Sequence, residues 1–160
     1  RVLYQYQVGD QGRLMEMSIF GAIDVAASGM TAERLRLDVI SNNIANVNTT
    51  RTVEGGPYRR QFVVFESRQG DASSFSSVMA GQLQMNGVRV SAIKKDDSPV
   101  RMVYEPGHPD ADANGYVQMP NINIVTEMVD MMTASRAYEA NVTSVNVAKS
   151  MMLKALEIGK

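Results

Sequence analysis

The sequence predicts a mainly α-helical protein with a small β insertion, in which long N- and C-terminal helices pair as a coiled coil. Near both ends of the 160-residue chain, apolar residues recur at the three- and four-residue spacing of helix seams. Glycine and proline break up the stretch between them, where apolar and polar residues alternate as they do in strands. We therefore divide the chain into 1–16, 17–49, 50–120 and 121–160.

The N-terminal helix is predicted over residues 18–48. Apolar side chains recur there in two series with a spacing of seven residues, interrupted at Glu33. Gly21 and Gly29 each cost about 1 kcal/mol relative to alanine, and the asparagines after residue 41 favour a helix end. Because nothing covers its apolar stripe in isolation, this helix needs a partner. Its predicted seam residues are Ile23, Met30, Leu37, Ile40, Ile44 and Val47.

The C-terminal helix is predicted over residues 121–158 and is the strongest element. The seven-residue series that starts at Ile124 is wholly apolar, and the series that starts at Met128 is apolar at three of its five positions. This helix would be roughly 57 Å long, and the N-terminal helix, at about 46 Å, is its intrachain candidate partner. Its predicted seam residues are Ile124, Met128, Met131, Tyr138, Val142, Val145, Met152 and Leu156.

The segment 1–16 is polar and aromatic and ends just before Met17, where the sequence MSIF is typical of a natural start. We interpret this segment as an upstream extension and leave it out of the fold prediction.

The middle segment is predicted to hold three or four short strands. Candidate strands are 58–66, 88–92 and 100–104, and a loop rich in Ser, Gly and Gln fills 67–87. A long turn rich in proline and glycine follows the last of these strands. Such an element is too small to bury a sizeable core by itself.

The composition excludes several classes of protein. With 16 Lys and Arg against 17 Asp and Glu, the net charge of −1 creates no global field for nucleic acid or anionic lipid. The absence of cysteine excludes thiol catalysis, disulfides and thiolate metal sites. No apolar run approaches the roughly 18–20 residues of a membrane span, and the N-terminus is not typical of a secretory signal. We expect no cofactor, nucleic acid, membrane insertion or small-molecule substrate.

Two motifs could carry chemistry. The stretch Asp110–Gly115 matches the first half of a calcium loop, but the twelfth position, which requires a bidentate glutamate, is Asn121. The same residue types are typical of a tight turn, which is the interpretation we prefer. His108 has no nucleophile or orienting partner nearby in the sequence, which indicates an exposed turn residue rather than a general base. We predict no catalytic residue and no metal site.

One stretch closely resembles a family motif. Residues 37–46, LDVISNNIAN, resemble the N-terminal motif of bacterial flagellar rod and hook proteins, with Ser41, Asn42, Asn43, Ala45 and Asn46 as the motif residues. Further stretches of this type are 48–52, 54–59, 104–107, 110–117, 119–121, 127–129, 135–136, 138–141 and 149–156. The resemblance covers about residues 17–66 and 87–160, whereas 1–16 and 67–84 have no counterpart.

The resemblance implies a structural subunit of the proximal rod, part of the drive shaft that transmits motor torque across the cell envelope. It implies polymerisation through the terminal helices, with further copies, other rod subunits, basal-body rings and the export gate as partners. It also implies export in unfolded form by the flagellar type III apparatus and a final location in the flagellar basal body, in the periplasm. The alternatives are a cytoplasmic coiled-coil adaptor and, less favoured, a calcium-dependent envelope protein.

Overall fold

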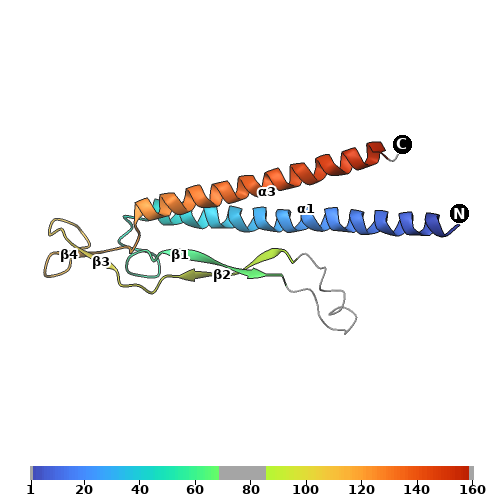
Figure 1. Cartoon of the computed structure of the whole chain (residues 1–160). Helices are drawn as coiled ribbons and strands as arrows, with labels where there is room; N and C mark the ends of the chain where they lie inside the picture. Colours follow the sequence, from blue (N-terminus) through green and yellow to red (C-terminus); the bar gives the residue numbers. More distant parts are fainter. Residues whose placement is uncertain (1, 69–85, 159–160) are drawn as a thin grey trace, which may run out of the picture. The chain divides into compact units, whose positions relative to one another are not determined.

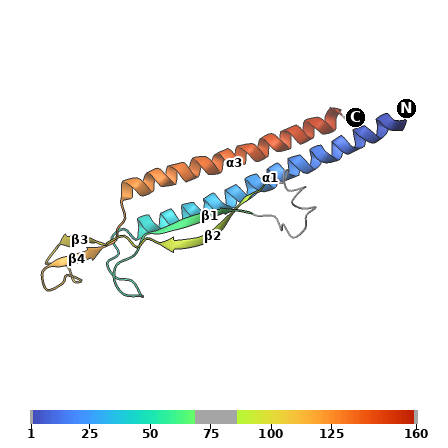
Figure 2. The same cartoon turned by 60° about the horizontal axis from the view of Figure 1, so that its bottom comes forward.

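The computed structural model describes residues 2–68 and 86–158, with side chains described from residue 20 onward. Figure 1 and Figure 2 show two views of the helices and strands. In chain order these elements are α1 (Val2–Ala45), β1 (Gln61–Ser67), β2 (Val88–Lys95), β3 (Arg101–Tyr104), β4 (Tyr116–Met119) and α3 (Ile124–Ile158). Long helices near both ends and small antiparallel sheets in the middle confirm the predicted mainly α-helical class with a β insertion.

Helix α1 begins earlier than predicted. It extends over 44 residues from Val2, whereas the sequence analysis started the helix at residue 18. The predicted start followed the sequence around Met17, but residues 1–16 contain no proline that would break a helix. The interpretation of 1–16 as an extension stays a prediction.

The predicted helix end is close to the observed one. Asn46 donates hydrogen bonds to the carbonyl oxygen of Asn42 from both its backbone nitrogen, at 3.1 Å, and its side-chain Nδ2, at 2.9 Å. The next bond, from Val47 N to Ile44 O at 3.3 Å, has tighter three-residue spacing. The asparagines therefore close the helix, as their low preference for helix interiors predicts.

Helix α3 begins at Ile124, three residues later than predicted, because Asn123 caps it. The Oδ1 atom of Asn123 accepts hydrogen bonds from the backbone nitrogens of Val125, at 3.0 Å, and Thr126, at 3.4 Å. This arrangement satisfies donors that have no partner within the first turn. The helix contains 35 residues, which corresponds to about 52 Å.

The strands form two sheets of two strands each, β1–β2 and β3–β4. In the second sheet Arg101 lies opposite Met119 and Tyr104 lies opposite Tyr116 in antiparallel register. Strand β4 falls where the sequence indicated a long turn, so its position was not predicted. Gly115, immediately before β4, has φ +81°, a backbone conformation that glycine adopts without strain. The predicted loop 67–87 lies largely outside the described residues.

Two compact units divide the chain, and each contains a part of α1 and a part of α3. The first unit consists of Arg1–Ala32, Glu66–Arg89 and Ala137–Lys160, and the second of Glu33–Phe65 and Val90–Arg136. Within the part that the structure describes, no helix is both long enough and apolar enough to cross a membrane.

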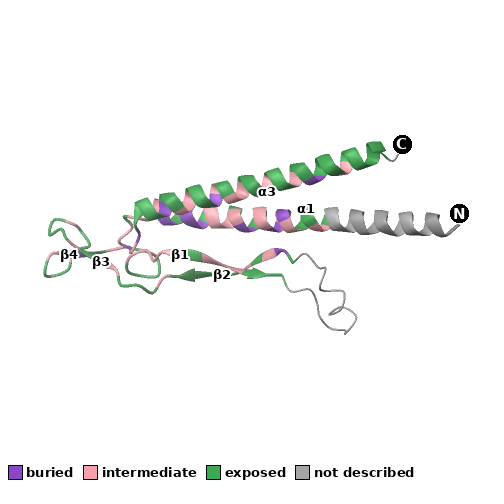
Figure 3. Cartoon of the chain, viewed as in Figure 1, coloured by how far each residue is buried: buried purple, intermediate pink, exposed green. Residues whose placement is uncertain are grey.

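Burial is sparse, and four of the eight buried hydrophobic residues are alanines. The buried hydrophobic residues are Ala26, Ala32, Val39, Ile40, Val117, Ile122, Ala134 and Ala148. Figure 3 colours buried positions purple and exposed ones green, and most of α3 is green. Large apolar side chains on α3 therefore remain in contact with water in the single chain.

In the first unit, α1 and α3 approach each other closely at Gly29. A Cβ atom added at this glycine would lie 2.9 Å from Nδ2 of Asn141, closer than side-chain packing permits. The absent side chain thus allows the two helices to approach.

Replacing Gly29 with leucine is expected to lower the free energy of unfolding by about 1–3 kcal/mol, because the new side chain must displace Asn141. Leucine has a higher helix propensity than glycine. A lower free energy of unfolding would therefore come from the contact with Asn141 and not from helix propensity. Urea unfolding followed by circular dichroism measures the change. Gly107→Ala is the control, because its added Cβ would meet no atom within 4 Å. A stabilising effect of Gly29→Leu would contradict the close approach.

Candidate assembly site

The second unit contains a group of polar side chains around the buried Asn43 and Glu127. We call it the Asn43 cluster: Asn43, Tyr58, Arg60, Glu127 and Asp130. The asparagine lies in the predicted motif near the end of α1 and is completely buried. The arginine and tyrosine come from the segment before β1, and the two acidic residues come from the first turns of α3. Three segments far apart in the sequence thus meet at one place.

Asn43 uses the full hydrogen-bonding capacity of its side-chain amide. Its Nδ2 donates to the carbonyl oxygen of Gln61 at 2.8 Å and to Oε2 of Glu127 at 3.0 Å. Its Oδ1 accepts from the backbone nitrogen of Gln61 at 2.9 Å and from the hydroxyl of Tyr58 at 3.1 Å. A side-chain amide can donate two hydrogen bonds and accept two, so none of this capacity is unused. An aspartate or a leucine at this position would leave buried groups without partners.

Glu127 is a buried carboxylate whose charge is compensated. Its side chain is 1% exposed, and its Oε1 accepts a hydrogen bond from Nε of Arg60 at 2.6 Å. The other oxygen accepts from Asn43, so both carboxylate oxygens have partners. The position in the first turn of α3 adds the favourable field of a helix N-terminus. Such compensation is required because an unpaired charge is very costly to bury.

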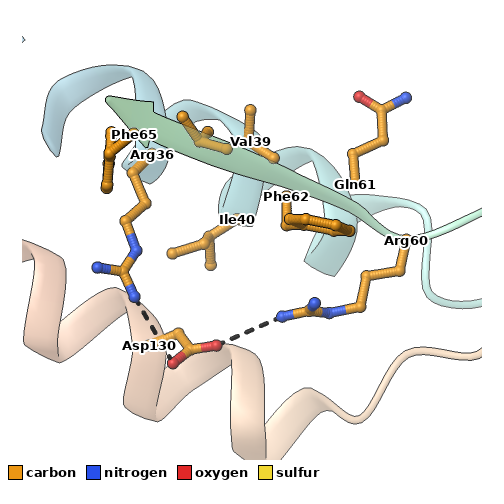
Figure 4. Close-up of a pocket in the computed structure, with 9 residues that line it drawn as sticks. Arg36, Val39, Ile40, Arg60, Gln61, Phe62, Phe65 and Asp130 are labelled. Atoms are coloured by element: carbon orange, nitrogen blue, oxygen red, sulfur yellow. Dashed lines mark hydrogen bonds and ion pairs between the residues drawn. The ribbon is translucent and has the colours of Figure 1, made fainter. Parts of the chain in front are cut away.

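A second carboxylate, that of Asp130, extends the pairing to α1. Figure 4 shows Arg36 and Arg60 approaching it from two sides. Nη2 of Arg60 lies 3.4 Å from one oxygen and Nη2 of Arg36 lies 4.0 Å from the other. Nη1 of Arg36 also lies 3.8 Å from Oε2 of Glu33, so together with Glu127 the group has two positive and three negative side chains.

The pocket beside these charges is small and has an apolar floor. Its volume is about 240 Å³, and Val39, Ile40, Phe62 and Phe65 line it together with Arg36. Small-molecule sites usually span about 300–1,000 Å³. The pocket suits a single side chain better than a substrate or a cofactor.

Tyr58 keeps its proton in this environment. Burial raises the pKa of its hydroxyl, the nearby negative charge of Glu127 raises the pKa further, and Lys95 partly offsets both effects. The hydroxyl therefore remains a donor to Asn43 at ordinary pH, and the cluster stays complete.

The predicted motif residues have different positions. Asn43 is buried and Asn46 is half-buried, where its Oδ1 accepts a hydrogen bond from the hydroxyl of Thr49 at 3.1 Å. The remaining motif residues, Ser41, Asn42 and Ala45, are exposed. Within the single chain, structural contacts thus explain two of the five.

The residues predicted to form the helix seam lie at different depths. Ile40 is buried, whereas Ile124, Met128 and Leu156 are exposed. The half-buried members are Ile23, Met30, Leu37, Ile44, Val47, Met131, Tyr138, Val142, Val145 and Met152. That this set forms the seam between copies stays a prediction.

The buried residues of α3 form a line that the sequence analysis did not identify. Glu127, Ala134 and Ala148 are 0%, 0% and 4% exposed, and multiples of seven residues separate them. On the helix surface, this line lies on one side of the predicted series that contains Ile124 and Met131. The other predicted series, which starts at Met128, lies on the opposite side of it. Alanine contributes little to an apolar pattern, and a glutamate counts against it. The seven-residue pattern therefore selected the larger apolar side chains of α3 as the seam and passed over Glu127 and the alanines.

Sequence reasoning also missed Arg60 and Tyr58, because their partners are distant in the sequence. The hydrogen bond between Arg60 and Glu127 joins residues 67 positions apart, and no local sequence pattern predicts it. One signal was available, since Glu127 is a charged residue three positions after Ile124 within an apolar repeat.

The acidic stretch Asp110–Gly115 makes the contacts of a turn. Oδ1 of Asp112 accepts hydrogen bonds from the backbone nitrogens of Asn114, at 2.8 Å, and Tyr116, at 2.9 Å. His108 is half-buried rather than exposed, and its Nδ1 accepts a hydrogen bond from the backbone nitrogen of Asp110 at 3.0 Å, a contact within the turn. Among the side chains that the structure describes, in residues 20–68 and 86–158, no group of three or more His, Cys, Asp and Glu could hold a metal ion.

Two family models match the ends of the chain. The model described as "Flagella basal body rod protein" matches residues 23–51, and the model described as "Flagellar basal body rod FlgEFG protein C-terminal" matches residues 113–158. The first range includes Asn43 and the second includes Glu127. Two of the three segments that build the Asn43 cluster therefore lie in matched regions.

Similarity to individual proteins covers most of the chain. The chain is 52% identical to the flagellar basal-body rod protein FlgC of Borreliella burgdorferi, over 89% of this chain and 98% of that protein. Identity to the FlgC of Bacillus subtilis is 48%, over 90% of this chain and all of that protein. Identity to the FlgC of Salmonella typhimurium is 44%, over 90% and 100%. With this identity over nearly the whole length of these relatives, the chain belongs to the family of flagellar basal-body rod proteins FlgC.

Proposed function

We propose that this chain polymerises through its terminal helices in the proximal part of the flagellar rod and there transmits motor torque across the envelope. Family membership already makes it a structural subunit of the basal-body rod, located within the cell envelope. The proposal adds the mode of assembly, the place in the rod and the mechanical role.

The observation that carries the proposal is the apolar surface that α3 leaves exposed. The large apolar side chains on this helix that remain exposed are Ile124, Val125, Met128, Val129, Met132, Val147, Met151, Leu153, Leu156 and Ile158. Burying one such side chain fully contributes about 1.5–3 kcal/mol. Neighbouring copies that cover this helix would therefore supply the free energy that holds a polymer together.

The contacts between α1 and α3 support their pairing as a coiled coil. In the first unit Gly29 allows the close approach of Asn141, and in the second unit Asn43 bonds to Glu127. Paired terminal helices would leave the middle segment free for other contacts. We propose that its partners are further copies, other rod subunits, basal-body rings and the export gate.

Export in unfolded form by the type III apparatus fits the chain. It contains no cysteine, so no disulfide would have to be reduced before passage. The described region buries only eight hydrophobic residues, four of them alanine, so little apolar surface would have to be exposed on unfolding. We propose no catalytic activity, nucleic-acid binding, membrane insertion, small-molecule substrate or cofactor for this chain.

Deletion and complementation in the bacterium that encodes the chain test the proposal. Without the gene, cells are expected to lose swimming, and a tagged copy is expected to restore it and to appear in purified basal bodies. A chain that stays in the cytoplasm while basal bodies form normally would favour a cytoplasmic coiled-coil adaptor. Loss of swimming on calcium removal, reversed by calcium only when Asp112 is present, would favour a calcium-dependent envelope protein.

A further inference from the structure

We propose that Asn43, Arg60 and Glu127 fix the register in which α3 lies against α1 and so exclude pairings displaced by one heptad. Within one chain this inference is independent of the proposed polymerisation. Its extension to pairing between copies rests on the proposed function.

The helix surfaces alone define the register weakly. On the buried line of α3, Ala134 and Ala148 present the same small side chain, and α1 presents Ala26 and Ala32. A displacement by seven residues moves a helix by about 10.5 Å and returns the same face to its partner. Asn141 lies between these alanines at the same seven-residue spacing. A displacement by one heptad would therefore put Ala148 beside Gly29, where a smaller side chain fits, and would be opposed on this line mainly because it puts Asn141 in the place of Ala134.

The cluster, by contrast, has no second copy along α3. Seven residues after Glu127 the chain has Ala134, and seven residues before it Pro120. Neither side chain could accept the hydrogen bond of Asn43 or pair with Arg60. In either displaced register the amide would lose a partner and the arginine its main counter-ion, whereas in the native register both are satisfied.

A third anchor connects the register to the sheet. Arg60 immediately precedes β1, and its backbone nitrogen donates to Oδ1 of Asn121, just before α3, at 3.3 Å. Asn43 also bonds to both backbone groups of Gln61, the first residue of β1. The positions of α1, β1 and α3 along one another are therefore coupled. Single buried polar groups are known to specify register in helix pairs at some cost in stability.

Because the chain has no cysteine, engineered cysteine pairs can report the register of the purified monomer. The native pair is Gly29→Cys with Asn141→Cys, since a Cβ at Gly29 would lie 3.1 Å from Cγ of Asn141. The displaced pair combines Gly29→Cys with Ala148→Cys, seven residues further on. Because α3 is one continuous helix, a displacement by seven residues brings residue 148 to the position beside residue 29 that residue 141 holds in the native register. With the natural cluster, only the native pair is expected to cross-link.

Two variants of the cluster test its role. In the apolar variant, Asn43→Leu, Arg60→Met and Glu127→Leu, the chain is expected to stay helical while the displaced pair gains yield. The expected gain is roughly fivefold, the population change that about 1 kcal/mol produces. In the relocated variant, Glu127→Leu and Ala134→Glu, the carboxylate moves by one heptad, and cross-linking is expected to move from residue 141 to residue 148.

The outcomes separate register from stability. If both variants are helical and cross-link only through the native pair, the inference is overturned. If the apolar variant fails to fold, the relocated variant decides by the same measurement, and its failure to move the cross-link overturns the inference too. Because these measurements use the monomer, they are independent of whether the chain restores swimming.

Discussion

Replacing Arg60 with methionine is expected to lower the free energy of unfolding by about 3–5 kcal/mol, because it leaves the carboxylate of Glu127 buried without a counter-ion. The side chain of Glu127 is 1% exposed, so water could not replace the lost partner. Asn43 would then be its remaining hydrogen-bond donor among the described side chains. Urea unfolding followed by circular dichroism measures the loss.

Arg59→Met is the matched control, because it removes the same charge one residue earlier. Arg59 donates to the carbonyl oxygen of Ser98 in an exposed contact, so we expect a loss of at most about 1 kcal/mol. In the double variant Arg60→Met with Glu127→Met, part of the stability is expected to return, since no buried charge is left unpaired. A loss below about 1 kcal/mol for Arg60→Met would show that water reaches Glu127.

Replacing Val145 with aspartate is expected to abolish rod assembly and swimming. This residue is half-buried in the single chain and belongs to the predicted seam of α3. If neighbouring copies cover it, the carboxylate must be desolvated against apolar side chains at a cost of several kcal/mol. A loss of about 1.4 kcal/mol already lowers an association constant tenfold, and every copy would carry the change. Swimming assays and the content of purified basal bodies measure the effect.

Two controls separate assembly from folding. Ser135→Ala removes a hydroxyl from the same helix without adding charge and is expected to preserve swimming. Asn146→Asp adds the same carboxylate at the next, exposed position, so it separates the effect of position from that of charge. Normal swimming with Val145→Asp at normal protein levels would show that this face is not covered in the rod.

The sequence predicted the elements whose signal is local. The spacing of apolar residues located both helices. The alternation from Val88 to Ala92 located β2, and the strands predicted at 58–66 and 100–104 overlap β1 and β3. The predicted helix boundaries were less accurate where a single capping residue, and not the apolar pattern, sets the end of the helix. Asn123 does this at the start of α3. Strand β4 was missed because four residues show little alternation. Its partner in the sheet, β3, lies on the other side of a long turn.

The Asn43 cluster could not be predicted in this way. The hydrogen bond between Asn43 and Glu127 joins residues 84 positions apart, and neither residue has a local feature that requires the other. The asparagine itself was identified within the motif, but the motif gives no reason for its burial. The structure supplies that reason, since the four bonds of its amide have partners in both α3 and the segment around β1.

The distance in sequence between Asn43 and Glu127 also has a consequence for timing during synthesis. Ribosomes add about 5–20 residues per second, so the 84 residues between these side chains take about 4–17 s to make. During that interval the residues of α1 have been made, but the acceptor of the Asn43 amide has not. The nascent chain therefore passes several seconds with the apolar side of α1 uncovered, long enough for another protein to bind it before α3 arrives.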